Sequence, residues 1–315
     1  AGGGPDGPGI RTSKSRFLNS MVILYRGGED ADDPNTWCGE DLERIIAACT
    51  MHVLGGPADH IHAWAPSQAA PGEEVAVLVR PEDEAHTGSS EPPGLLTVLL
   101  DGEQLEARAE SVPDTTCVRL RVPLREDGVH RLIVRDEKTD SEAVTNPIVC
   151  RAALPDRRAW WGMIHGHSEM SDGTGTLNHY FRQLRDEAAL DFGAPGDHDH
   201  LNETSDEMWE VTCRRVREWH EPKRFVTLLG YEWAKWRQNG DGDRNVYFLQ
   251  DDRPMYRSDK GEYPTPPDLF EVLQHEDAIV IPHHTGHRGN FCDWKDHDPE
   301  RERLVIRARW AAVMD

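Results

Sequence analysis

Two histidines two residues apart, His165 and His167, follow an apolar run at residues 160–164. If that run is a β-strand, alternate side chains point to the same side, so both imidazoles project together. A carboxylate, Asp172, follows five residues after His167. Two co-facing imidazoles with a nearby carboxylate can form part of a metal site, because nitrogen and oxygen donors suit zinc and related transition metals.

Three later apolar runs are also followed by potential metal ligands. The runs and the ligands after them are 190–194 with Asp197-His198-Asp199-His200, 225–229 with Glu232, and 278–281 with His283-His284. In parallel α/β architectures the carboxyl ends of the strands lie at one rim, where active sites are built. The repetition therefore predicts that four separate clusters meet in space.

Helical patterns alternate with these runs. Apolar residues recur at helical spacing in 177–190, 206–220 and 268–276. Strands that alternate with amphipathic helices are typical of βαβ units and a parallel sheet. We therefore predict an α/β domain with a parallel sheet or barrel over residues 155–315.

A different pattern precedes this domain. Residues 58–154 contain short alternating runs such as 118–122, with turn signals at Asp101-Gly102 and Asp127-Gly128. They predict a small β-sandwich domain of immunoglobulin-like outline. Its histidines are expected to be surface or structural residues because no carboxylate motif accompanies them: His60, His62, His86 and His130. Residues 1–57 are predicted to form a leader and a supporting segment.

Composition excludes several function classes. The 315 residues carry a formal charge of -22, whereas non-specific nucleic-acid binding needs a basic surface. No apolar run approaches the roughly 18 residues of a membrane span. The six cysteines contain no CxxC pair, so no zinc finger is expected. We expect neither a nucleic-acid nor a membrane partner, and a cytoplasmic location; the oligomeric state stays open.

Four motifs together resemble the polymerase-and-histidinol-phosphatase (PHP) superfamily of metal-dependent phosphoesterases, in particular a bacterial branch with an N-terminal β-rich region. They are HGHSEMSDG, GDHDH, GYEW with RNVYF, and IPHHTG, within residues 160–294. The resemblance implies a distorted (β/α)7 barrel whose rim holds two or three divalent ions of Zn, Mn or Fe. The superfamily's late Asp-x-His motif is not found before Asp315, so we expect a C-terminally incomplete barrel of four βα units.

The resemblance also implies roles for individual residues. The implied metal ligands are His165 and His167 on a first ion, Glu232 bridging to a second, His284 (alternatively His283) on that second ion, and Asp172 with His198 on a third. Asp197 is expected to orient His198 from behind.

The function expected from these residues is hydrolysis of a small anionic phosphate ester by a metal-activated water. Candidate substrate-binding cations are Lys235, Arg237, Arg244 and Arg288. His200 or His287 is the candidate general acid. Two alternatives stay open: an amidohydrolase-like enzyme with a non-phosphate substrate, and a catalytically inert, truncated binding protein.

Overall fold

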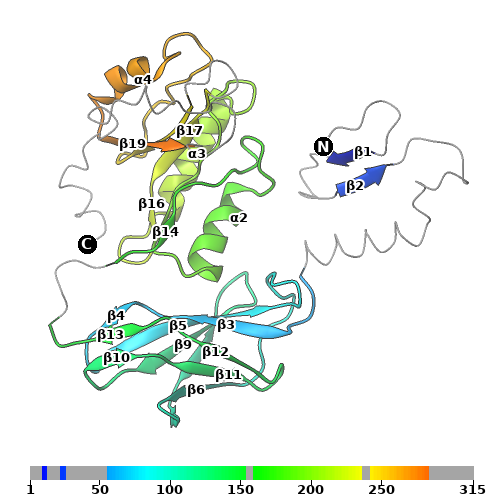
Figure 1. The fold of residues 1–315 in the computed structure, drawn as a ribbon, viewed down its shortest axis with the longest axis vertical. Helices are drawn as coiled ribbons and strands as arrows, with labels where there is room; N and C mark the ends of the chain where they lie inside the picture. Colours follow the sequence, from blue (N-terminus) through cyan, green and yellow to red (C-terminus); the bar gives the residue numbers. More distant parts are fainter. Residues whose placement is uncertain (1–8, 13–21, 26–54, 154–158, 236–241, 284–315) are drawn as a thin grey trace, which may run out of the picture. The chain divides into compact units, whose positions relative to one another are not determined.

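The computed structural model describes five stretches of the chain, drawn in colour in Figure 1: residues 9–12, 22–25, 55–153, 159–235 and 242–283. Four of the predicted site residues lie outside these stretches: Arg237, His284, His287 and Arg288. The chain divides into two units, Ala1–Ala159 and Trp160–Asp315, and each is described by itself. In the described residues no helix has the length and apolar character that crossing a membrane requires.

The first unit is built from strands. They are β1 (Gly9–Thr12), β2 (Val22–Tyr25), β3 (His60–Trp64), β4 (Gln68–Ala69), β5 (Glu74–Glu82), β6 (Leu96–Leu100), β7 (Glu103–Leu105), β8 (Arg108–Ser111), β9 (Val118–Pro123), β10 (Gly128–His130), β11 (Ile133–Asp136), β12 (Ser141–Val144) and β13 (Ile148–Cys150). β1 pairs with β2. Two four-stranded antiparallel sheets follow, in the orders β3-β5-β9-β8 and β12-β11-β6-β7, with a smaller sheet β10-β13-β4.

One hydrophobic core joins the two larger sheets. Val77 and Leu120 from the first sheet share a buried cluster with Val98 and Val134 from the second, so the sheets pack face to face as a β-sandwich. The alternation along each strand explains this packing. In β9, Leu120 and Val122 are buried, because every second side chain faces the core.

The second unit begins with a parallel sheet of three very short strands, in the order β14 (Gly162–Met163), β15 (Phe192–Gly193) and β16 (Val226–Thr227). The crossovers between them contain α2 (Leu177–Arg182), its continuation η1 (Gln183–Glu187), and α3 (Asp206–Trp219). The hydroxyls of Thr176 and Ser205 cap α2 and α3 by accepting from backbone N–H groups of the first turn, which satisfies donors that a helix start leaves unpaired.

An antiparallel sheet completes the second unit. It contains β17 (Leu229–Trp233), β18 (Asp243–Phe248) and β19 (Ala278–His283), with β18 in the middle. The helix α4 (Pro266–Leu273) precedes β19, and the Asp268 carboxylate accepts from the backbone N–H of Thr265 at its start. Aromatic and aliphatic side chains of the antiparallel sheet and of the three α-helices form one buried core, which also includes Phe225 just before β16.

The predicted (β/α)7 barrel is wrong. Among the described strands of the second unit, only β14, β15 and β16 form a parallel sheet, and β17 follows β16 after a single residue with no helix between them. The RNVYF stretch forms most of β18, which pairs antiparallel with β17 on one side and with β19 on the other. β19 is therefore not the fourth parallel strand of a barrel. Most described elements are strands, with three α-helices and one π-helical turn.

A short parallel bridge nevertheless joins the two sheets of this unit. His198, five residues beyond β15, pairs with Glu232 of β17. The Glu232 N–H donates to the Asp197 carbonyl at 2.9 Å, and the Asp199 N–H donates to the Glu232 carbonyl at 3.0 Å. The chain after β15 therefore runs beside β17, which brings two of the predicted ligand clusters together.

Candidate metal centre

The Glu232 carboxylate lies at the centre of the second unit's histidines. Its side chain is fully buried. Four imidazole Nε2 atoms face it: His167 at 3.3 Å, His165 at 3.6 Å and His198 at 3.7 Å from Oε2, and His283 at 3.7 Å from Oε1. Two sets of ligand atoms are close enough to hold an ion, His165-Glu232-His283 and His167-His198-Glu232. Because both sets include Glu232, its carboxylate could bridge two ions.

Strand register explains why these residues meet. In the antiparallel sheet Glu232 is paired with Asn245, and Asp243 with His283. Cross-strand partners, and residues two apart on one strand, share a face of the sheet. Glu232 and His283 therefore lie on the same face although they are 51 positions apart in the chain. The predicted convergence of the clusters is produced by a sheet of different topology from the one expected.

In three of these imidazoles Nε2 faces Glu232, and the other ring nitrogen, Nδ1, contacts an oxygen atom. The pairs are His165 Nδ1 with Asn245 Oδ1 at 3.0 Å, His167 Nδ1 with Asp172 Oδ1 at 3.1 Å and Ser171 Oγ at 3.2 Å, and His198 Nδ1 with Glu203 Oε2 at 2.6 Å. A carboxylate or carbonyl oxygen at Nδ1 holds the proton there and leaves the Nε2 lone pair for a metal. The surroundings thus orient the imidazoles toward Glu232.

The charge of the Glu232 carboxylate depends on the imidazoles around it. Burial by itself would raise the pKa of the Glu232 carboxyl, but the hydrogen bond from His167 and the charges of the other three imidazoles outweigh it and lower the pKa to about 2. Burial would lower the pKa of His167, but Glu232 and Asp172 raise it. A buried carboxylate stays ionised only where cations face it, so protons or metal ions on the imidazoles would keep Glu232 ionised.

The expected role of Asp197 is corrected. Its carboxylate accepts from the backbone N–H and hydroxyl of Ser168 and from the hydroxyl of Ser171, each at 2.7 Å. It braces the loop that carries His167, whereas the oxygen at His198 Nδ1 belongs to Glu203. Asp197 and His198 are neighbours in an extended segment, so their side chains point to opposite sides. No spacing rule in the sequence singled out Glu203.

Asp172 lies behind the imidazoles. Its Oδ1 is 3.1 Å from His167 Nδ1 and 3.9 Å from His198 Nδ1, on the sides of the rings that face away from Glu232. Asp172 does not belong to either of the two ligand sets around Glu232. Its role as a ligand of a third ion stays a prediction.

The candidate general acid and cations lie at different places. His200 is buried, and its Nε2 donates to the Ala234 carbonyl at 2.7 Å, while its Nδ1 is 3.9 Å from Glu203 Oε1. Lys235 is buried directly beyond β17. Arg244 is also buried, but it alternates with Asn245 along β18 and so lies on the face opposite Glu232. That position does not bring Arg244 to the imidazole cluster.

Comparison with known proteins gives a family, curated relatives and structural neighbours. Residues 174–314 match the family described as "Protein of unknown function (DUF3604)". An uncharacterised protein of Chlamydia pneumoniae is 24% identical over 261 residues, and one of Chlamydia trachomatis is 25% identical over 260 residues. Each alignment covers 81% of this chain and 42% of the relative, so the chain spans less than half the length of these relatives.

The structural neighbours are β-domains. The Lin-41 filamin domain aligns with 31% of this chain and 100% of its own, at 15% identity and a TM-score of 0.26. The tandem Ig repeats of Dlar align with 36% of this chain and 60% of their own, at 11% identity and a TM-score of 0.24.

The resemblance to the PHP superfamily is therefore wrong. The family whose model matches residues 174–314 is a different one, and the described strands of the second unit do not form a barrel. The motifs that carried the resemblance are short runs of histidine and carboxylate at strand ends. Similar constellations recur on unrelated folds wherever the same chemistry is needed, so such motifs indicate a type of site more securely than a family.

Proposed function

We propose that this chain is a metal-dependent hydrolase of phosphate esters that works with two divalent ions at the Glu232 centre. The observation that carries the proposal is the arrangement of four imidazole Nε2 atoms around the two oxygens of one buried carboxylate. The proposal includes a third ion held by Asp172 and His198, and His200 as a candidate general acid.

The donor atoms fit ions of the zinc, manganese and iron class. The ligand sets contain imidazole nitrogen and carboxylate oxygen and no thiolate, a mixture that these ions accept. The nitrogen-to-oxygen distances of 3.3 to 3.7 Å are close to the separation of about 3.3 Å between neighbouring ligands when metal bonds are about 2.0–2.1 Å long in a tetrahedron. Only small movements would be needed to bring each set onto one ion.

When bound, such a pair of ions supplies a nucleophile by lowering the pKa of water, and it neutralises charge on the phosphoryl oxygens. The chain's own residues prepare this centre. Asn245 and Asp172 keep protons on the Nδ1 atoms of His165 and His167, so both Nε2 atoms are ready to bind. Burial of Glu232 excludes bulk water, which strengthens every charge interaction at the centre.

The overall charge favours a metal-centred way of binding phosphate. With a formal charge of -22, the chain repels anions at a distance, so local positive charge must attract the substrate. The ions would provide most of it, and Lys235, two residues beyond β17, is the remaining candidate cation within the described residues near this sheet.

The proposal is tested by assaying the Mn²⁺- and Zn²⁺-loaded chain on 4-nitrophenyl phosphate, bis(4-nitrophenyl) phosphate and a 4-nitroanilide. We expect phosphate-ester turnover that needs metal and falls at least about 100-fold in Glu232→Gln, the upper range seen when a metal's supporting residues are lost. Glu262→Gln, at an exposed position, is the matched control and should keep the activity.

Each contrary result has a definite meaning. Turnover of the anilide alone would overturn the phosphate ester as substrate class. Metal binding without turnover of either substrate class would show that the chain binds metal but is not a hydrolase of these substrates. Equal turnover in wild type and Glu232→Gln would show that Glu232 does not belong to the catalytic centre.

A further inference from the structure

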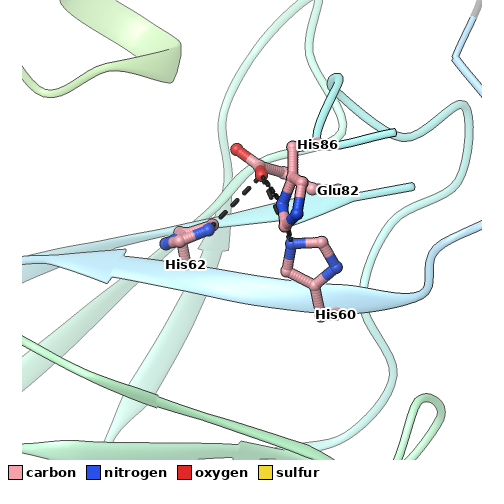
Figure 2. Close-up of side chains that lie close together, drawn as sticks. All are labelled: His60, His62, Glu82 and His86. Carbon is pink, nitrogen blue, oxygen red and sulfur yellow. Dashed lines mark hydrogen bonds and ion pairs between the residues drawn. The ribbon is translucent and has the colours of Figure 1, made fainter. Parts of the chain in front are cut away.

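A second cluster of histidines surrounds a carboxylate on the β-sandwich. His60 and His62 come from β3, Glu82 is the last residue of β5, and His86 lies in the loop that follows β5. Figure 2 shows the three imidazoles gathered around the Glu82 carboxylate. The earlier expectation that these histidines have no carboxylate partner is wrong for three of the four. His130 lies apart and contacts the Glu126 carbonyl at 2.8 Å.

Strand register again explains the cluster. β3 and β5 are antiparallel, with His60 opposite Glu82 and His62 opposite Arg80. These side chains share the outer face of the sandwich, because the residue between the two histidines, Ile61, is buried in the core.

The distances within the cluster match those of metal ligands. The Nε2 atoms of His60 and His62 are each 3.4 Å from Glu82 Oε2, and His86 Nδ1 is 3.7 Å from the same oxygen. His86 Nδ1 is also 3.0 Å from His60 Nε2. These values bracket the separation of about 3.3 Å between neighbouring ligands of a tetrahedral site with bonds of about 2.0–2.1 Å. One ion could therefore take all four ligands with little movement.

Neighbouring residues orient the ligands from behind. Asp59 Oδ2 is 3.1 Å from His60 Nδ1, which leaves His60 Nε2 for a metal. The Trp64 ring stacks on His62, with centroids 5.7 Å apart and an angle of 18° between the planes. Arg80 Nε is 3.6 Å from Glu82 Oε1 and leaves Oε2 toward the imidazoles. Such supporting contacts are typical of metal sites and are not needed by solvated surface histidines.

The loop that carries His86 is held in a defined shape. The buried Asp83 carboxylate accepts from the N–H groups of Gly56, Ala85 and Thr87. His86 itself has a φ of 60°, which side chains other than glycine rarely adopt. The fold thus maintains an unfavourable backbone conformation at the residue that closes the cluster, and such residues concentrate at functional sites.

We propose that His60, His62, Glu82 and His86 bind one Zn²⁺ ion. Three imidazole nitrogens and one carboxylate oxygen make a complete tetrahedral set, as in structural zinc sites, where no position is left for a substrate. Calcium and magnesium are disfavoured because they need several oxygen ligands and the cluster offers one carboxylate. The ion would tie the loop after β5 to β3. This site lies in the first unit and does not depend on the proposed hydrolase.

The test is a Zn²⁺ titration of the full chain by calorimetry in a Glu232→Gln background, which disables the other centre. We expect one equivalent to bind. In the same background His62→Ala should raise the Kd for Zn²⁺ at least about 100-fold, because it removes one of four zinc ligands. His130→Ala, a surface histidine of the same unit outside the cluster, is the matched control and should keep the affinity. Equal Kd values for the two variants would overturn the proposal.

A second measurement does not need the Glu232 substitution. Cobalt bound in place of zinc gives visible absorption that is intense only in tetrahedral sites. We expect His62→Ala and Glu82→Gln each to lose one Co²⁺ equivalent of this absorption relative to wild type and to His130→Ala, with unchanged far-ultraviolet circular dichroism. No loss in either folded variant would contradict the site.

Discussion

The two units of this chain use the same short pattern in different surroundings. His60-x-His62 on β3 and His165-x-His167 after β14 each present two imidazoles to a glutamate from another strand. On the sandwich the cluster is open, with His62 48% and His86 74% exposed. In the second unit the imidazoles are less exposed, His198 at 6% and His165 at 25%. Equal spacing therefore gives similar local geometry at two places that differ in how far the imidazoles are exposed.

The glutamates differ in the same way. In Glu82 one oxygen faces three imidazoles and the other is near Arg80, so a single ion is the natural occupant. In Glu232 both oxygens face imidazoles, which suits a bridge between two ions. A one-ion site closed by four protein ligands stabilises a fold, while a two-ion centre with fewer ligands per ion leaves room for substrate.

The largest expected effect comes from removing the brace of the sandwich loop by Asp83→Ala. The substitution leaves the N–H groups of Gly56, Ala85 and Thr87 without their acceptor, the first of them buried and the other two partly buried. We expect a loss of about 3 kcal/mol of unfolding free energy, since each buried donor left unsatisfied costs about 1–3 kcal/mol and part of the loop can rehydrate. Urea denaturation measures it, and a loss below about 0.5 kcal/mol, typical of surface changes, would contradict the bracing role.

This effect should depend on pH. Burial by itself would raise the pKa of Asp83, but the hydrogen bonds from Gly56, Thr87 and Ala85 outweigh it and lower the pKa from 3.8 to about 2. A carboxylate with a lowered pKa stabilises the fold fully above its ordinary pKa and loses that contribution as the pH falls toward the lowered value. The difference in stability between wild type and Asp83→Ala should therefore shrink between pH 4 and pH 2.

A smaller effect is expected from the oxygens behind the imidazoles, and it should differ between the units. Glu203 contacts His198 Nδ1 at 2.6 Å in a mostly buried position, whereas Asp59 contacts His60 Nδ1 at 3.1 Å and is exposed. Glu203→Gln should weaken metal binding at the Glu232 centre by about 10–100-fold. Asp59→Asn should weaken zinc binding on the sandwich by less than about 10-fold, because water screens an exposed pair. Calorimetric Kd values that rise by the same factor in the two variants would contradict the role of burial.

Local features of the fold could be predicted from the sequence. The helix expected at 206–220 is α3, Asp206–Trp219, because its Ser205 cap and its apolar spacing lie within the segment itself. The alternation at 118–122 lies in β9 for the same reason. The meeting of His165, His198 and Glu232 was also expected, since each residue follows or ends a recognisable apolar run.

Pairing between distant segments could not be predicted. Nothing local in 243–248 shows that this strand lies between β17 and β19, and that placement is what replaces the barrel by an antiparallel sheet. Glu82 lies 20 positions after His62, and only the register of β3 with β5 brings them together. Glu203 likewise reaches His198 through a turn that has no distinctive spacing.

The central claim is that one glutamate bridges two ions while the other contributes to a one-ion site. It is tested most directly by counting tightly bound Zn²⁺ per chain after gel filtration, in wild type, Glu232→Gln and Glu82→Gln. The account predicts that Glu232→Gln loses two equivalents and Glu82→Gln loses one, independently of each other because the residues lie in different units. Equal losses in the two variants, or no loss in either, would contradict it.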